Sequence, residues 1–531
     1  MAGIALTSLF SQLNQWPGTL FEADSNTTVL TQTAKQFSFR YASTGVDFPD
    51  YRVVVTGTGF AFDSGGAYDG VMSSVRIFNA AGQLVLSFAN LAPNTLASDF
   101  SQFYANVFGS SSGEGPGPDG FVAMSHLMSH NDVITGTAGD DRQSLAGMDV
   151  GNDVYNLLAG DDYVNGGIGD DTINGGAGTD MLSFWNTAWN EGVTAWRGIA
   201  VDVVAGTVLD PWGGTDSIIS VEEFEGSRFS DSFAGGASRN WFAGLRGRDT
   251  IDGGDNSFDA FGNATNDLDD AVSYQSDYWS GGSRGIVANL ETSFVNGSIR
   301  GTIRDGFGNL DTVIDIENVE GTRFNDVFVG SRVDNVFAGG EGVDSYRGAG
   351  GYDAIDFDTW FGDVQPGGIR VDLSLAVGQI IDDGFGNTET ATGIEDIGAG
   401  SGNDWIKGSA GFNFISGGLG ADTMAGGAGS DTFLWYDPGE FNQGDRITDF
   451  TAAGAAADHL AFEVASFAGM TGTLVLVNGP AATQAVGTFI FRNANDTLYW
   501  DPDGTGAAAA QLVAVLTNVS ALSAANFDLW T

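Results

Sequence analysis

A nine-residue pattern of polar and apolar positions dominates the chain from residue 148 onward. Six residues rich in Gly, Asn and Asp are followed by three residues whose middle member is always apolar or aromatic. The pattern keeps its phase through four blocks, at residues 148–183, 226–252, 321–356 and 399–434. The first six residues predict a turn, because Gly adopts positive φ and allows close backbone approach. The last three predict a very short strand with one inward side chain.

Such a short strand cannot bury a hydrophobic side chain alone, so neighbouring units must stack into a solenoid. Two units make one coil of eighteen residues, and their turns alternate between the two edges of the solenoid. Side chains at equivalent turn positions therefore form rows along each edge, with neighbours two units apart. The pattern predicts an all-β chain built from blocks of β-solenoid.

The sixth position of each unit carries the candidate chemistry. It is Asp in twelve of the fifteen units and Asn at Asn240, Asn335 and Asn413. Rows of carboxylates in a partly desolvated groove would repel one another unless a cation lay between them. Carboxylate and turn carbonyl oxygens suit Ca²⁺, and the absence of a rigid octahedral cage disfavours Mg²⁺. The predicted ligands of several calcium ions, including one in a degenerate unit that begins at Gly136, are Asp141, Asp153, Asp162, Asp171, Asp180, Asp231, Asp249, Asp326, Asp344, Asp353, Asp404, Asn413, Asp422 and Asp431.

Units such as GGIGDDTIN (166–174) and GGAGSDTFL (426–434) resemble the RTX, or hemolysin-type, nonapeptide GGxGxDxUx. The resemblance implies a parallel β-roll with Ca²⁺ between successive turns. The units of Asp231, Asn240, Asp326 and Asn335 lack Gly at position four. Their turns are therefore candidates for metal-free end rungs.

The segments around the blocks predict further β structure. Residues 51–63 and 73–91 alternate in an N-terminal β-rich domain, which is expected to anchor the protein or to take part in its assembly. Between blocks, related spacers begin at Gly198, Gly285 and Gly368 with alternating apolar residues and are expected to extend the solenoid. The phrases YWDPDGTG and FDLW near the C-terminus resemble the C-terminal region of RTX proteins exported by type I secretion, and this region is also expected to form a β cap. The expected division is 1–125, N-terminal domain; 126–183, 226–256, 321–356 and 399–435, repeat blocks; 184–225, 257–320 and 357–398, spacers; and 436–531, C-terminal cap and secretion region.

Composition narrows the classes of function. The 531 residues carry a net charge of −48, which repels phosphate backbones and argues against nucleic-acid binding. No run of 18 apolar residues predicts a membrane span. Cys is absent, which excludes disulfides and thiolate metal sites.

The possible catalytic motifs in this sequence are weak. His126 and His130 are four residues apart, but Leu127 stands where a zinc metalloprotease motif needs Glu. GSSSG around Ser111 matches a nucleophile-elbow pattern only formally, because it lies in a low-complexity linker. No pair of Asp residues stands out as a glycosidase pair, so we expect no enzymatic activity.

The leading hypothesis is a secreted, calcium-binding structural protein of a Gram-negative bacterium. It would fold on Ca²⁺ outside the cell and self-associate into a surface layer, sheath or extracellular matrix. An alternative is a calcium-dependent adhesin for a surface, glycan or lipopolysaccharide, with spacer aromatic residues as contacts. In that case Trp185, Trp189, Trp196, Trp212, Tyr278, Trp279 and Trp360 should be exposed. A third hypothesis, an enzyme within residues 1–125, is the weakest.

Overall fold

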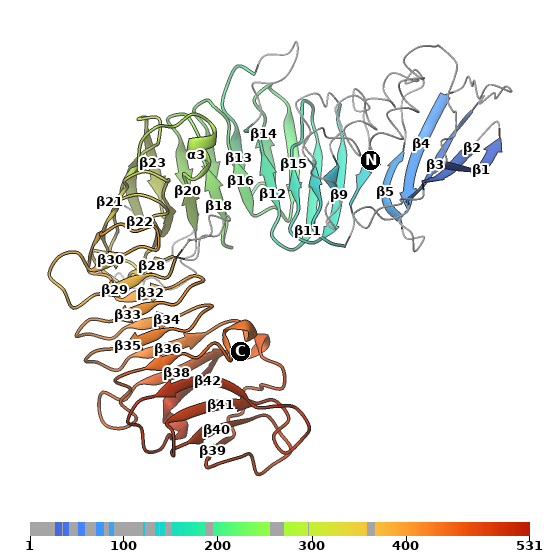
Figure 1. Ribbon diagram of the computed structural model, residues 1–531. Helices are drawn as coiled ribbons and strands as arrows, with labels where there is room; N and C mark the ends of the chain where they lie inside the picture. The colour runs from blue at the N-terminus through green and yellow to red at the C-terminus, as the bar shows by residue number, and fades with distance from the viewer. Residues whose placement is uncertain are drawn as a thin grey trace. The chain divides into compact units, whose positions relative to one another are not determined.

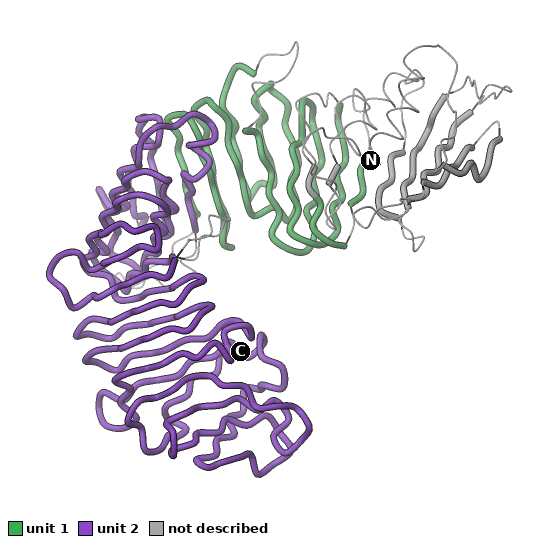
Figure 2. Tube along the Cα trace, viewed as in Figure 1, with its two compact units in different colours: residues 1–255 green, residues 256–531 purple. Residues whose placement is uncertain are grey.

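The computed structural model describes most of the chain after residue 132 and only strands before it. The described residues are 27–33, 36–41, 51–58, 71–78, 84–89, 121–122, 133–136, 138–143, 151–185, 195–254, 270–295, 297–357 and 367–530. His126, His130, Ser111, Trp189 and Trp360 lie outside them. Within this part of the chain, no helix has the length and hydrophobicity needed to cross a membrane. Two compact units, residues 1–255 and 256–531, divide the chain (Figure 2).

The first unit begins with an antiparallel meander. Its strands are β1 (Thr27–Thr33), β2 (Gln36–Tyr41), β3 (Tyr51–Thr58), β4 (Val71–Phe78) and β5 (Leu84–Ala89). Strand β5 pairs with β7 (Val133–Thr135), which in turn lies parallel to β9 (Val154–Ala159). The meander therefore continues directly into the sheet of the repeat region.

The repeats form the predicted β-roll (Figure 1). Strand β9 pairs in parallel with β11 (Thr172–Ala177), and this register places Tyr155 beside Ile173, one coil of eighteen residues apart. On the other side, β10 (Tyr163–Val164) pairs with β12 (Met181–Ser183), with Val164 beside Leu182. These four position-eight side chains are at most 1% exposed. The core of the roll is thus built from one inward side chain per nonapeptide, as the sequence pattern predicts.

The spacers insert antiparallel strands between successive coils. In the first spacer, β15 (Thr215–Ile219) lies parallel to β11, then pairs with β14 (Thr207–Leu209), which pairs with β13 (Ala200–Asp202). Strand β13 also pairs in parallel with β17 (Ser232–Ala234), so the sheet of the roll continues beyond the spacer. The other strands of the roll in this unit are β8 (Arg142–Gln143), β16 (Glu223–Glu225), β18 (Trp241–Ala243) and β19 (Thr250–Asp252). Strand β6 (Phe121–Val122) pairs with β8.

The second unit repeats this arrangement. One spacer contributes β21 (Val287–Val295), β22 (Ser298–Arg304) and β23 (Leu310–Ile314), preceded by β20 (Ala271–Ser273) and the short helix α3 (Ser276–Trp279). The last spacer contributes β29 (Arg370–Asp372), β30 (Ile380–Asp382) and β31 (Thr390–Thr392). The repeat strands are β24 (Asn318–Glu320), β25 (Val327–Val329), β26 (Val336–Ala338), β27 (Ser345–Arg347), β28 (Ala354–Asp356), β32 (Asp396–Gly398), β33 (Trp405–Lys407), β34 (Phe414–Ser416), β35 (Thr423–Ala425) and β36 (Thr432–Trp435).

A C-terminal β cap closes the second unit. Strands β37 (Arg446–Ile447) and β38 (His459–Glu463) continue the two sheets of the roll, and β43 (Phe527–Trp530) pairs in parallel with β38. Strands β39 (Leu476–Asn478), β40 (Thr488–Arg492), β41 (Thr497–Asp501) and β42 (Gln511–Leu516) complete the cap. Aromatic packing fills it, with the Phe462 ring centroid 5.2 Å from that of Trp435 and 4.8 Å from that of Phe489. The terminal FDLW sequence is therefore the last strand of the cap.

Glycine at position four is required by the spacing of successive coils. A Cβ atom on Gly169 would lie 1.5 Å from the carbonyl oxygen of Gly151, the position-four residue of the preceding coil. The same contact would be 1.4 Å between Gly420 and the carbonyl oxygen of Gly402, and Gly420 also has a φ of +143°. Only Gly satisfies both the close approach and this backbone conformation.

We expect Gly420→Ala to disrupt block four more than a positive φ alone would. Gly454→Ala is the matched control, because Gly454 has a φ of +112° but open space around its α-carbon. The control should lower the free energy of unfolding by about 1–3 kcal/mol, and Gly420→Ala should lower it by more. Urea unfolding in saturating calcium measures both values. Equal losses would show that the contact with Gly402 is not what selects Gly.

Candidate metal sites

Within the blocks, position-six carboxylates use one oxygen to join two coils. Asp171 Oδ1 accepts a hydrogen bond of 2.7 Å from the backbone N–H of Asp153, which is position six of the preceding coil. Asp422 Oδ1 accepts the equivalent bond from Asp404 at 2.8 Å. The pattern recurs in the pairs Asp141–Asp162, Asp162–Asp180, Asp231–Asp249, Asp326–Asp344, Asn335–Asp353 and Asn413–Asp431. The structure thus places every predicted ligand in a row along an edge of the roll.

In several turns the second carboxylate oxygen is buried and lies against a position-one glycine. A Cβ atom on Gly417 would be 2.6 Å from Asp422 Oδ2, and one on Gly175 would be 2.2 Å from Asp180 Oδ2. Among the described residues, this Oδ2 atom has no hydrogen-bond partner at Asp162, Asp171, Asp180, Asp404 and Asp422. A buried carboxylate oxygen without a donor is strongly unfavourable unless a cation binds it.

Burial and neighbouring carboxylates raise the pKa values of these groups. Desolvation, with the charge of Asp216 as the next cause, raises the pKa of Asp171 to about 9. Desolvation likewise raises the pKa of Asp422 to about 8, and the charges of Asp404 and Asp445 add to the effect. The ion pairs seen among the described residues join Arg323 to Glu341, Arg332 to Glu291, Lys407 to Asp372 and His459 to Asp528. None of them reaches Asp162, Asp171, Asp180, Asp404 or Asp422, so within this part of the chain no protein cation stabilises the charged form of these carboxylates.

A second kind of turn satisfies its position-six side chain within the protein. Asp231 Oδ2 accepts from the Ser227 backbone N–H at 2.8 Å, while its Oδ1 accepts from the Ser227 hydroxyl at 2.8 Å and from Ile199. Asp326 has the same contacts with Thr322 and with the backbone of Ile286. We call these self-capped turns. We call a turn open where the position-six Oδ2 has no partner among the described residues, as at Asp171 and Asp422.

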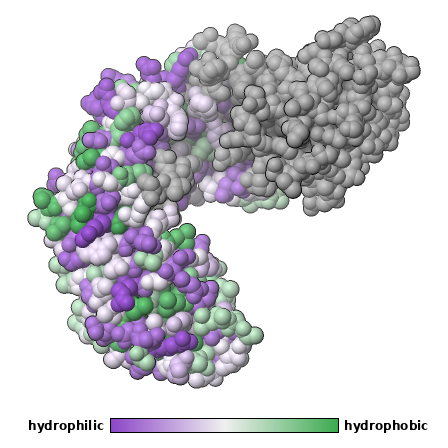
Figure 3. All heavy atoms as spheres, in the orientation of Figure 1, coloured by the Kyte–Doolittle hydropathy of each residue, from purple (hydrophilic) through white to green (hydrophobic). Residues whose placement is uncertain are grey.

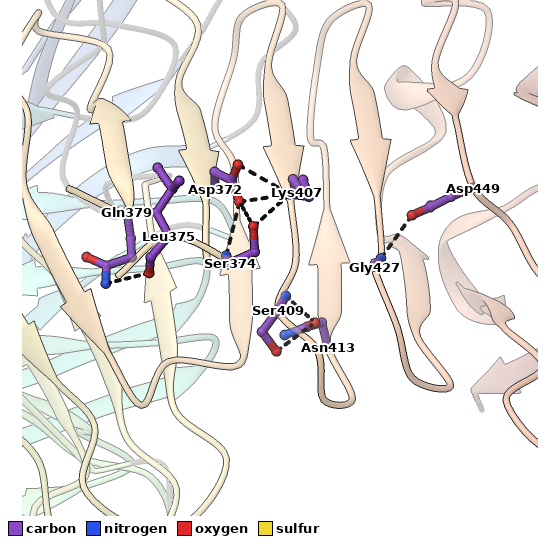
Figure 4. Close-up of polar contacts among 9 residues, drawn as sticks. All are labelled: Asp372, Ser374, Leu375, Gln379, Lys407, Ser409, Asn413, Gly427 and Asp449. Atoms are coloured by element: carbon purple, nitrogen blue, oxygen red, sulfur yellow. Dashed lines mark hydrogen bonds and ion pairs between the residues drawn. The ribbon is translucent and has the colours of Figure 1, made fainter. Parts of the chain in front are cut away.

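Asn413 also belongs to a self-capped turn. Its Oδ1 accepts from the Ser409 backbone N–H at 2.8 Å and from the Ser409 hydroxyl at 3.3 Å (Figure 4). Its amide nitrogen donates to the Glu395 carbonyl oxygen, as that of Asn335 does to Glu317. This geometry argues against calcium ligation by Asp231, Asp326 and Asn413. The sequence signal that separates the two kinds was available, because Ser or Thr at position two marks these turns (Ser227, Thr322, Ser331 and Ser409).

Backbone carbonyls complete the chemistry of an open turn. In the described residues, no group of three or more His, Asp or Glu side chains converges to hold a metal ion. An ion in a row must therefore take most of its ligands from the backbone. Around the turn of Asp422, the carbonyl oxygens of Gly400 and Gly402 face the α-carbons of Gly418 and Gly420. Buried carboxylate oxygen plus carbonyl oxygens form a hard, all-oxygen donor set, which fits Ca²⁺.

A family model for the RTX calcium-binding nonapeptide repeat (4 copies) matches residues 128–142, 149–182, 225–257, 320–355 and 398–433. This is an RTX calcium-binding repeat protein. Its repeats bind Ca²⁺, and repeats in this number accommodate several ions. The matched segments contain all fourteen predicted ligands. No curated protein matches the chain.

We expect Asp171→Ala to weaken calcium-induced folding, because it removes both the unpaired oxygen and the hydrogen-bond acceptor for Asp153. The calcium midpoint, followed by circular dichroism, should rise on the order of tenfold, or about 1.4 kcal/mol. Asp422→Ala should act similarly in block four. Asp170→Ala is the matched control, because Asp170 is exposed and its removal costs an acceptor for the Thr215 N–H but no buried, unpaired oxygen. Midpoints unchanged from wild type in both test variants would remove these residues from the ligand set.

The raised pKa values predict opposite pH dependences with and without calcium. In the calcium-free fold, carboxyls such as Asp171 bind protons more tightly than in the unfolded chain. The fold is therefore most stable at low pH and loses stability as pH rises through about 8 to 9. Calcium binding needs the deprotonated form, so the calcium-loaded protein should gain stability over the same range. Circular dichroism in EDTA should show more β structure at pH 5.5 than at pH 8.5, whereas urea unfolding in calcium should show greater stability at pH 8.5. More β structure at pH 8.5 than at pH 5.5 in EDTA would contradict the prediction.

Proposed function

We propose that this chain is a secreted calcium-dependent structural protein that folds outside the cell and assembles there into a surface layer, sheath or matrix. The observation that carries the proposal is the set of buried position-six carboxylates whose second oxygen has no partner among the described residues. A fold that contains such rows is unfavourable without a divalent cation. Whether the chain folds therefore depends on the calcium concentration of the compartment that it occupies.

The free calcium concentration differs between the two sides of the cell envelope. Extracellular calcium modules bind with dissociation constants of roughly 10⁻⁴ to 10⁻³ M, well above the free calcium level of a cytosol. Binding to the folded state alone adds stability by mass action. The chain would thus stay unfolded before export and fold after it, with binding free energy acting as folding free energy.

The C-terminal region fits this order of events. Proteins with RTX repeats are typically secreted, and the C-terminal motifs of this chain resemble those of type I substrates. The FDLW sequence forms β43, whose partner β38 continues the sheet of block four through β36. A type I signal in this region would therefore be accessible before the cap folds, and export would precede folding.

Charge sets the conditions for assembly. The net charge of −48 makes copies of the chain repel one another. On the drawn face, hydrophilic and hydrophobic residues are interspersed (Figure 3). Self-association through such a surface requires divalent cations between acidic groups, so calcium should control assembly as well as folding.

An adhesin is the second candidate, and exposed spacer aromatics favour it. Trp196 is 63% exposed and Trp279 is 79% exposed, and Trp185 and Tyr278 are also exposed. Trp212 is half-buried. The Arg323 guanidinium lies 4.4 Å from the centroid of the Tyr278 ring. Aromatic rings beside arginine would suit a glycan or an acidic polysaccharide.

We expect full-length protein to be largely unfolded and monomeric in EDTA, and to form β structure and ordered assemblies in millimolar Ca²⁺. Circular dichroism, light scattering and negative-stain electron microscopy measure these changes, and equal Mg²⁺ is the control. Monodisperse particles after calcium folding would contradict the structural role. Binding of those particles to glycans, lost in Trp196→Ala or Trp279→Ala, would then support the adhesin.

A further inference from the structure

The first spacer ends in a segment that mimics a repeat unit. Residues 214–219, GTDSII, match positions four to nine of the nonapeptide, with Gly214 at position four, Asp216 at position six and Ile218 at position eight. No unit in the phased blocks includes them, and the family match leaves them out. We call residues 214–219 the closing segment.

The closing segment takes the place of the next coil after the unit of Asp171. Strand β11 pairs in parallel with β9 on one side and with β15 on the other, so that Ile173 lies between Tyr155 and Ile218. The Ser217 N–H donates to the Asp171 carbonyl oxygen at 2.7 Å, as the Thr172 N–H does to that of Asp153. The backbone register of the roll thus continues into the spacer.

The turn of the closing segment also copies the repeat. A Cβ atom on Gly214 would lie 1.8 Å from the Gly169 carbonyl oxygen, which matches the contact between Gly169 and Gly151. The Thr215 N–H donates to Asp170 Oδ1 at 2.8 Å, and the Asp170 N–H donates to Asn152 Oδ1 at 3.1 Å. Positions four and five therefore repeat the contacts made one coil earlier.

Asp216 completes the carboxylate row. Its Oδ1 accepts the Asp171 backbone N–H at 3.0 Å, as Asp171 Oδ1 does for Asp153. Its side chain is fully buried, and Oδ2 has no hydrogen-bond partner among the described residues. A Cβ atom on Gly166 would lie 3.2 Å from Asp171 Oδ2 and 3.8 Å from Asp216 Oδ2, so the two unpaired oxygens approach the same point.

We propose that Asp216, although outside the nonapeptide repeats, is a calcium ligand that holds the last ion of the first block together with Asp171 and backbone carbonyls. Two buried carboxylate oxygens that lie within 3.8 Å of one point and have no donor favour a cation between them. The inference rests on calcium binding by the repeats and is independent of assembly outside the cell.

The loop before the closing segment supports an ion in this position. Asp210 Oδ1 accepts from the backbone N–H groups of Trp212 and Gly214 at 2.8 and 2.7 Å, and it organises the loop. Its Oδ2 is buried without a partner in the described part of the chain and lies on the same side of Gly214 as the Gly169 carbonyl oxygen. In the corresponding loop of the last spacer, the Asn387 amide donates to Asp383 Oδ2 at 2.9 Å. The first spacer has Gly214 in place of that Asn, which leaves an additional negative oxygen at this turn.

The test separates a ligand from a structural acceptor by two substitutions. Asp216→Asn keeps the Oδ1 acceptor for Asp171 but removes the charge, whereas Asp216→Glu keeps the charge. Asp202→Asn in the same spacer is the matched control, because Asp202 is exposed and, among the described residues, accepts only from the Ala205 N–H. The measurements on full-length protein are the number of bound calcium ions, by equilibrium dialysis with metal analysis, and the calcium midpoint of folding by circular dichroism.

We expect Asp216→Asn to bind one ion fewer than wild type, or one ion at least tenfold more weakly, while Asp216→Glu and Asp202→Asn keep the wild-type count. Without calcium, Asp216→Asn should be no less stable than wild type, because it removes a charge beside Asp171. Failure of Asp216→Asn to fold in calcium, with Asp216→Glu folding, also supports the ligand. An unchanged ion count and midpoint in Asp216→Asn would overturn the proposal, as would equal losses in the Asn and Glu variants. Neither result depends on whether the protein assembles.

Discussion

The buried carboxylate that joins two coils is the constraint on which the rest of this structure depends. Within a block, a position-six Asp uses one oxygen to hold the backbone of the preceding coil, as Asp422 holds Asp404. That bond fixes the carboxylate in the interior of the turn and places its second oxygen against the position-one glycine, as at Gly417. The geometry that stacks the coils therefore also creates the demand for a cation. Stability and calcium binding are properties of the same side chains.

Because self-capped and open turns are distributed unevenly, the blocks differ in how strongly they need a cation. Asp231 and Asp326 occupy the first units of blocks two and three, and spacer residues Ile199 and Ile286 donate to them. Ser227 and Thr322 satisfy their remaining oxygens, so these block starts need no ion. Among the described residues, the open turns lie in blocks one and four, at Asp162, Asp171, Asp180, Asp404 and Asp422. Blocks two and three thus begin on protein contacts alone, whereas the demand for a cation is shown in blocks one and four.

The repeat fold and the rows of ligands could be predicted from the sequence because the nonapeptide has a fixed period. The position-eight side chains and the eighteen-residue coil follow directly from that period. The turns of Asp231, Asp326 and Asn335 were candidates for metal-free turns because they lack Gly at position four. Their capping by Ser or Thr at position two, and the self-capped turn of Asn413, were not predicted. The closing segment was missed for another reason. Asp216 lies 45 residues after Asp171 rather than eighteen, so only strand pairing reveals that they are neighbours.

The 45 residues between Asp171 and Asp216 show how a β-roll accommodates a spacer. Asp344 and Glu389 are also 45 residues apart, and the Asp344 N–H donates to Glu389 Oε1 at 2.9 Å. In both places the inserted strands leave and rejoin the sheet, and the carboxylate row continues into the spacer. The spacer can therefore vary in its outer strands and loops without disturbing the rows, provided that its last segment keeps the register. Exposed side chains such as Trp196 lie in such outer parts. The constraint within the row thus leaves the spacers free to diversify in what they contact.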